Sequence, residues 1–221
     1  MSWFSADSKL DQMAEPLPRE ELLRRARVII LDDDPPENIE DLRQEGLAID
    51  LIGNTDDVRF KKIEAGFYDV LLLDYGGIGR KHGPEEGLDV LRHLKRINPS
   101  LIVLAYTART FDSSKADFFR MSDGVLRKDA GIRETLEIIE GHLAKAMTVA
   151  HQWLAMRQAL EGSVQPERLQ ELEAAIAKAI ESPAKSTKVR EMLSAMGNAG
   201  AEALLSVVLE KIIEIGIRGH V

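Results

Sequence analysis

The chain has 221 residues, of which 44% are hydrophobic and 30% charged, with a formal net charge of −8 and no cysteine. The lack of cysteine excludes disulfides, thiolate metal sites and thiol nucleophiles, and the acidic balance argues against a protein that works mainly by neutralising nucleic-acid phosphates. The first twenty residues lack the basic start and apolar core of a secretory signal. No uncharged apolar stretch approaches the roughly 20 residues of a membrane span. We therefore expect a cytoplasmic protein without a membrane partner.

Short aliphatic runs alternate with amphipathic stretches between residues 27 and 130. The runs lie at 27–31, 48–52, 68–73, 101–105 and 124–127. Helix-like stretches lie between them at 37–46, 57–66, 86–97 and 113–121. This alternation predicts βαβ units and therefore an α/β domain with a five-stranded, parallel, doubly wound sheet. The first twenty residues show no clear period, and we expect residues 1–26 to form a loosely packed lead-in.

Strand signals stop after Gly131, and another helix begins near Ile132. Apolar side chains recur at spacings of three and four from Leu136 to Leu160, with Arg157 interrupting the series. This stripe predicts one long helix, from about residue 132, that pairs with a second copy of the chain. Pro166 is suited to open the next helix. We therefore predict a lead-in at 1–26, an α/β domain at 27–145 and an all-helical output and dimerisation region at 146–221.

The last predicted helix is apolar around much of its circumference, although four charges argue against a bilayer span. A helix of this kind should be buried, either inside its own bundle or against another chain. Residues 161–221 contain seven Lys and Arg against nine Asp and Glu, a net charge of −2. We therefore favour a homodimer that acts by protein contact, and DNA is not an expected partner. A nucleic-acid-binding helical tail is the alternative output.

Polar side chains follow the predicted strands where each strand ends. Three carboxylates, Asp32 to Asp34, follow the first strand, and Asp74 follows the third. Thr107 and Lys128 end the fourth and fifth. Because the carboxyl ends of parallel strands meet at one sheet edge, these groups should converge. Clustered carboxylates need a cation at neutral pH, and oxygen ligands favour Mg²⁺ or Mn²⁺. A carboxylate beside such an ion can attack a phosphoryl group, while a hydroxyl and an ammonium take the phosphoryl oxygens.

Four segments, "VIILDDD", "VLLLD", "LAYTA" and "GVLRK", make residues 27 to about 145 resemble the receiver domain of two-component response regulators. The resemblance implies a phosphorelay protein whose partner is a histidine kinase or a phosphotransfer protein. It implies no enzymatic activity beyond self-phosphorylation and self-dephosphorylation. Asp74 would be the phosphoacceptor, with Thr107 and Lys128 on the phosphoryl group. The implied ligands of Mg²⁺ or Mn²⁺ are Asp33, Asp74 and the Gly76 carbonyl, with Asp32 acting mainly through water.

The sequence departs from the receiver pattern at three places. Asp129 follows the lysine where the family usually has proline, and Val125 stands where the family has its switch aromatic. A standard aromatic switch is therefore unavailable unless a ring at 118 or 119 substitutes. The loop after Asp74 is also longer than usual. Three of its residues could contact the phosphodonor partner, namely Arg80, Lys81 and His82.

A phosphohydrolase of the haloacid dehalogenase type is the main alternative. Asp32 would be its nucleophile and Asp34 its acid, with Thr107 and Lys128 as the second and third motifs. That class needs a further strand that ends in an acidic pair after the lysine, whereas the sequence there is helical. It also leaves Asp74 without a role.

Overall fold

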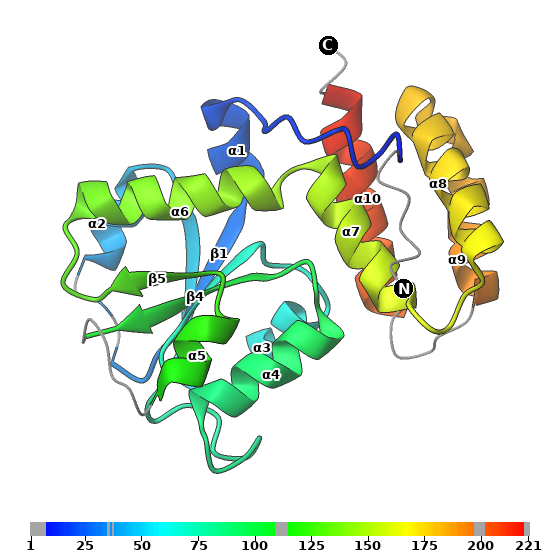
Figure 1. Ribbon diagram of the computed structural model, residues 1–221. Helices are drawn as coiled ribbons and strands as arrows, with labels where there is room; N and C mark the ends of the chain where they lie inside the picture. The colour runs from blue at the N-terminus through cyan, green and yellow to red at the C-terminus, as the bar shows by residue number, and fades with distance from the viewer. Residues whose placement is uncertain (1–7, 35, 37, 109–114, 197–201, 219–221) are drawn as a thin grey trace. The chain divides into compact units, whose positions relative to one another are not determined.

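The computed structural model describes residues 8–34, 36, 38–108, 115–196 and 202–218 (Figure 1). The chain divides into two compact units. Pro18–Ala146 form the first, which we call the N-terminal unit, and Met147–Val221 form the second together with Met1–Leu17. We call the second the helical unit.

The N-terminal unit contains one sheet of five parallel strands in the order β2-β1-β3-β4-β5. Its strands are β1 (Arg27–Leu31), β2 (Ala48–Ile52), β3 (Val70–Leu73), β4 (Ile102–Thr107) and β5 (Gly124–Arg127). Leu31 pairs with Leu73, and Leu73 pairs with Ala105, so the three central strands are in register near their carboxyl ends. The predicted α/β, doubly wound, flavodoxin-like fold is confirmed.

Six helices among the described residues surround this sheet. They are α1 (Arg19–Arg25), α2 (Ile39–Gln44), α3 (Val58–Glu64), α4 (Gly87–Ile97), α5 (Ala116–Met121) and α6 (Ile132–Ala146). Helices α3, α4 and α5 pack in a row on one face, and α2 and α6 pack together on the other (Figure 1). Residues 113 and 114, where the sequence predicted the start of a helix, lie outside the described residues.

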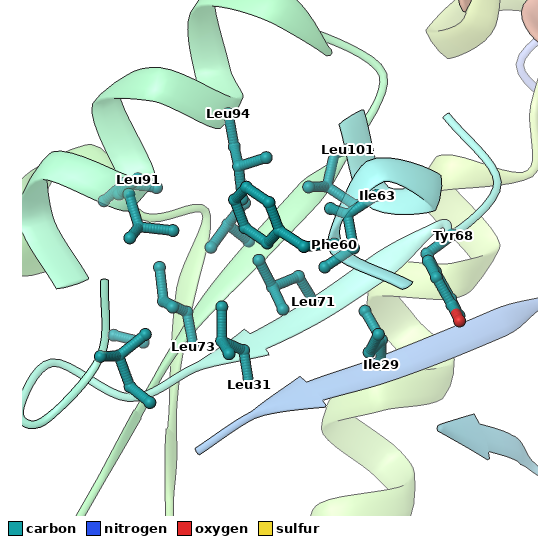
Figure 2. Packing of buried hydrophobic residues seen from close by; sticks show 14 of the residues in the cluster. Ile29, Leu31, Phe60, Ile63, Tyr68, Leu71, Leu73, Leu91, Leu94 and Leu101 are labelled. Atoms are coloured by element: carbon teal, nitrogen blue, oxygen red, sulfur yellow. The ribbon is translucent and has the colours of Figure 1, made fainter. Parts of the chain in front are cut away.

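Alternating strand residues fill the space between the sheet and α3, α4 and α5. Ile29 and Leu31 of β1 and Leu71 and Leu73 of β3 point to this side, where they meet Phe60 of α3 (Figure 2). All five are almost completely buried. Full burial of each such side chain stabilises the fold by about 1.5–3 kcal/mol. The intervening residues of the same strands are also buried, on the other face, which explains why these strands read as continuous aliphatic runs.

The helical unit contains four α-helices among its described residues. They are α7 (Val149–Leu160), α8 (Pro166–Glu181), α9 (Ser186–Met196) and α10 (Glu202–Arg218), with a 3₁₀ turn at Pro183–Lys185. Pro166 opens α8, as predicted. Helix α10 packs against the other three, and Gly216 lets it approach Ile180 so closely that an added Cβ would lie 2.8 Å from that side chain. The apolar last helix is therefore buried within its own chain.

Residues 8–17 differ from the predicted loose lead-in, because they pack on the helical unit. Leu10 is fully buried, and Asp11 accepts two hydrogen bonds from the guanidinium of Arg157, at 2.9 and 3.1 Å. The Met13 carbonyl accepts a hydrogen bond from the Ala150 amide at 3.1 Å. Arg157, which interrupts the apolar stripe in the sequence, is thus paired within its own unit.

The predicted long helix is wrong, because it is divided into α6 and α7. Helix α6 ends at Ala146, and Thr148 caps α7 by accepting a hydrogen bond from the His151 amide at 3.1 Å. Ile139 and Trp153 of the predicted stripe are buried, each within a different unit. The stripe is therefore divided between two helices that belong to different units. Among the described residues, no helix is both long and apolar enough to cross a bilayer.

Candidate functional site

The ends of β1 and β3 bring three carboxylates together. The Asp32 amide donates to the Ile52 carbonyl at 3.1 Å, and the Asp74 amide donates to the Leu31 carbonyl at 3.0 Å, so the sheet ladder extends to both acids. Carboxylate oxygens of Asp32, Asp33 and Asp74 lie within 4.8 Å of one another. The Asp32 side chain is buried, Asp74 is partly buried and Asp33 is exposed. A hard divalent cation fits this all-oxygen set.

Lys128 lies next to two of these acids. Its Nζ is 2.6 Å from Oδ2 of Asp32 and 3.5 Å from Oδ2 of Asp74. The Lys128 amide donates to the Thr107 carbonyl at 2.8 Å, which joins the ends of β4 and β5. Burial alone would lower the pKa of Lys128, but the hydrogen bond from Lys128 to Asp32 and the charges of Asp74 and Asp32 raise it above its usual value. The ammonium is therefore a permanent charge at this sheet edge.

The charge state of Asp74 depends on its surroundings. Burial raises the pKa of its carboxyl group, the Lys128 charge opposes this rise, and the nearby Asp32 charge adds to it. The Tyr75 amide donates a hydrogen bond to Asp74 and lowers the pKa by a smaller amount. A cation beside Asp74 would favour the ionised form that a nucleophile requires.

Asp32, which is expected to act on the metal mainly through water, also has protein partners of its own. It is 1% exposed, its Oδ2 contacts Lys128, and its Oδ1 accepts a hydrogen bond from the Asp34 amide at 2.9 Å. The structure thus gives Asp32 a direct protein partner. Asp34 itself is exposed.

No protein-family model and no curated protein matches the chain. Among solved structures, the chain is 21% identical to a CheY-like receiver domain protein from Methanospirillum hungatei, over 55% of this chain and 95% of that one, with a TM-score of 0.45. It is 26% identical to the response regulator TrrA from Thermotoga maritima, solved in complex with Mg²⁺-BeF, over 53% and 98% of the chains, with a TM-score of 0.42. A two-component response regulator from Clostridium difficile is 20% identical over 53% and 95%, with a TM-score of 0.44. The matched residues correspond to the N-terminal unit, whose strand order β2-β1-β3-β4-β5 is that of a doubly wound, flavodoxin-like sheet.

The N-terminal unit has two tyrosines at its site that the sequence analysis did not single out. Tyr106 is buried, and its ring centroid lies 5.6 Å from Nζ of Lys128. Burial, together with the charges of Asp32 and Asp74, raises the pKa of Tyr106 to about 12. The position of Tyr106 just before Thr107 was a usable signal, because the end of a strand next to a candidate site residue borders the site.

Tyr75 links Asp74 to two helices. Its carbonyl accepts the Gly87 amide at the start of α4, at 3.0 Å, and its ring meets Phe118 of α5 edge-on with centroids 5.3 Å apart. Val125 is 41% exposed on β5, whereas Phe118 is fully buried. An aromatic residue therefore connects the acid to α5, although no ring stands at position 125.

Arg80, Lys81 and His82 of the long loop each contact other residues of the N-terminal unit. Arg80 pairs with Glu86 at 3.2 Å, and Lys81 pairs with Asp56. The third member of the set, His82, packs against two rings, those of Phe60 and His93, with centroids 5.3 and 5.0 Å away. The long loop is thus held against α3 and α4. Asp129, in place of the usual proline, pairs with Arg127 at 3.1 Å.

Proposed function

We propose that the chain is a response regulator that accepts a phosphoryl group on Asp74, from a histidine kinase, a phosphotransfer protein or a small phosphodonor. The observation that carries this proposal is the convergence of three carboxylates and Lys128 at the carboxyl edge of the sheet. Asp74 is the candidate nucleophile because it is partly accessible, whereas Asp32 is buried against Lys128. The same fold in proteins named as response regulators supports the proposal.

The proposed reaction forms an acyl phosphate. A carboxylate oxygen of Asp74 attacks phosphorus, the bond from phosphorus to the donor's histidine nitrogen breaks, and its electron pair stays on that nitrogen, which takes a proton from solvent. When bound through Asp33, Asp74 and the Gly76 carbonyl, with Asp32 beside it, Mg²⁺ or Mn²⁺ would offset the charge on the phosphoryl oxygens. Lys128 and Thr107 supply the protein's own cation and hydroxyl to those oxygens.

The phosphohydrolase alternative is less well supported. It makes Asp32 the nucleophile, yet Oδ2 of Asp32 contacts Lys128 and Oδ1 accepts the Asp34 amide. It also needs another strand and acidic pair after the lysine, whereas β5 is followed by α6 and then by helices through the rest of the described chain. The geometry therefore favours Asp74.

For output, we propose that the helical unit acts by protein contact rather than by binding nucleic acid. Its acidic balance lacks the electrostatic attraction that supplies most non-specific DNA affinity. The two features that predicted a homodimer are partly covered within one chain. The stripe from Leu136 to Leu160 is divided between α6 and α7, and α10 packs against α7, α8 and α9. A homodimer stays a prediction, and the proposed output by protein contact does not depend on it.

The proposal is tested by incubating the full chain with acetyl phosphate and measuring its intact mass, with and without Mg²⁺. We expect a phosphoryl adduct on the wild type that requires the ion and is lost in Asp74→Asn. An adduct retained in Asp74→Asn but lost in Asp32→Asn would favour the phosphohydrolase reading. No adduct on the wild type from this donor or from a phosphorylated histidine kinase would contradict the proposal.

A further inference from the structure

The loop between β3 and α4 runs directly against the acidic site. Gly77, with φ of +72°, lies so close to Asp33 that an added Cβ would overlap Oδ2 of that carboxylate. The backbone here adopts a left-handed conformation that glycine tolerates best. The peptide between Gly76 and Gly77 is therefore next to one of the proposed metal ligands.

Glu86 holds this peptide from the other end of the loop. Its Oε2 accepts the Gly77 amide at 2.9 Å, and its Oε1 accepts Nε of Arg80 at 3.2 Å. Three quarters of the side chain is covered, since it is 24% exposed. A hydrogen bond from an amide to a carboxylate in such a place is stronger than one between neutral groups.

The backbone of Glu86 is strained. With φ of 50° and ψ of −117°, it is the single non-glycine residue with positive φ among the described residues. A conformation of this kind is unfavourable for a residue with a Cβ and persists only where the surroundings impose it. Here the next residue, Gly87, imposes it: its amide bonds to the Tyr75 carbonyl, and a Cβ on it would lie 2.5 Å from the Asp74 carbonyl oxygen.

We propose that Glu86 is a positioning residue for the metal site and acts through the Gly76 carbonyl. The Gly76 carbonyl and the Gly77 amide belong to one planar peptide, so a bond that fixes the N–H direction also fixes the C=O direction. The negative charge on the N–H side also increases the electron density on the carbonyl oxygen and makes it a better ligand for a hard cation. This inference rests on the proposed function, because that function places the metal at Gly76.

The experiment measures Mg²⁺ affinity of the full chain by calorimetry, in the absence of any phosphodonor. Glu86→Ala removes the acceptor, and Glu86→Gln keeps an acceptor but removes the charge. Glu85→Gln is the matched control, because it removes the same charge from the neighbouring residue, whose carboxylate pairs with Arg92 outside the site. Outer-shell partners of metal ligands typically contribute about 10–100-fold in affinity. We expect a loss of about tenfold or more in Glu86→Ala, a smaller loss in Glu86→Gln and less than about twofold in Glu85→Gln.

Two further measurements separate the possible outcomes. Thermal unfolding without Mg²⁺ should show that Glu86→Gln and Glu85→Gln are both folded well above the temperature of the calorimetry, so that a difference in affinity does not reflect unfolding. If Asp33→Asn abolishes Mg²⁺ binding but Glu86→Gln behaves as Glu85→Gln does, the role of Glu86 is overturned and the proposed function stands. A wild type that does not bind Mg²⁺, or an Asp33→Asn variant that binds it unchanged, overturns both.

Discussion

Nζ of Lys128 lies 2.6 Å from Oδ2 of Asp32 and 3.5 Å from Oδ2 of Asp74, so one ammonium bridges the first and third strands of the sheet. In this arrangement Lys128 would compete with a divalent cation for Asp32. If Asp74 carries a phosphoryl group, as we propose, the same ammonium has a stronger anion within reach. Lys128 should therefore weaken the binding of the divalent cation and strengthen the binding of the phosphoryl group.

Replacing Lys128 with methionine should change Mg²⁺ and beryllofluoride binding in opposite directions. Without the competing ammonium, we expect Mg²⁺ affinity to rise, by up to about tenfold, which is about 1.4 kcal/mol. The variant also lacks the ammonium that would contact the fluorine atoms of beryllofluoride. In the presence of Mg²⁺, beryllofluoride should therefore bind about tenfold more weakly or worse. Calorimetry with each ligand checks this, and a parallel fall in both affinities would contradict the account.

Tyr75 should carry structural change from Asp74 to α5. Its ring meets Phe118 edge-on, a contact that contributes about 0.5–1.5 kcal/mol beyond burial. We expect Tyr75→Ala to reduce the chemical-shift response of Phe118 to beryllofluoride, while phosphorylation from acetyl phosphate continues. Tyr75→Phe is the control, since it keeps the ring and should keep the response. An unchanged response in Tyr75→Ala would remove Tyr75 from the coupling route.

His82 should make the N-terminal unit less stable in acid. Burial is the main cause that lowers the pKa of His82 below its usual value, and the charges of His93 and Lys81 lower it further, against smaller opposing effects of Glu64 and Asp56. The folded state then binds its proton less readily than the unfolded state. The stability contributed by neutral His82 is present above the unfolded pKa, near 6.5, and is lost as the pH falls towards the folded pKa.

The test compares thermal unfolding of the wild type and His82→Gln at about pH 7.5 and about pH 5.5. The wild type should lose more stability over this interval than the variant. The pKa of His142 is also lowered, mainly by burial, but His142 is present in both proteins and its effect cancels in the comparison. Equal losses would show that the docking of His82 on Phe60 does not depend on its charge.

Two helical glycines should respond in opposite ways to alanine. A Cβ added at Gly216 would lie 2.8 Å from each of the atoms Cδ1, Cγ1 and Cγ2 of Ile180. Gly216→Ala should therefore destabilise the helical unit by about 1–3 kcal/mol. At Gly141 of α6 nothing lies within 4 Å, so Gly141→Ala should stabilise the protein by about 0.5–1 kcal/mol. Denaturant unfolding checks both. A neutral Gly216→Ala would mean that α10 packs less closely on α8 than the structure describes.

The sheet and its acidic edge could be predicted because buried parallel strands have a strong sequence signature. The runs ending at Leu31 and Leu73 are aliphatic on both faces, and each is followed at once by an acid. Three strands match their predicted limits, at 27–31, 48–52 and 124–127. Such a pattern places side chains at the sheet edge without any knowledge of loop conformation.

The break at Thr148 and the position of Glu86 could not be predicted in the same way. Apolar residues continue at spacings of three and four from Ile139 to Trp153, across Thr148. Periodicity alone therefore does not reveal that Ile139 and Trp153 are buried in two different units. Thr148 as a helix cap was the available local signal. The bond from Gly77 to Glu86 depends on the path of an irregular loop, which no periodic pattern encodes.

The central claim, that Asp74 is the phosphoacceptor, is tested most directly by locating the modified residue. Borohydride reduces an aspartyl phosphate to homoserine, which tandem mass spectrometry of peptides can assign to one position. After reaction with acetyl phosphate and Mg²⁺, we predict homoserine at position 74 of the wild type and aspartate retained at positions 32, 33 and 34. Homoserine at position 32 with Asp74 intact would contradict the account and favour the phosphohydrolase reading.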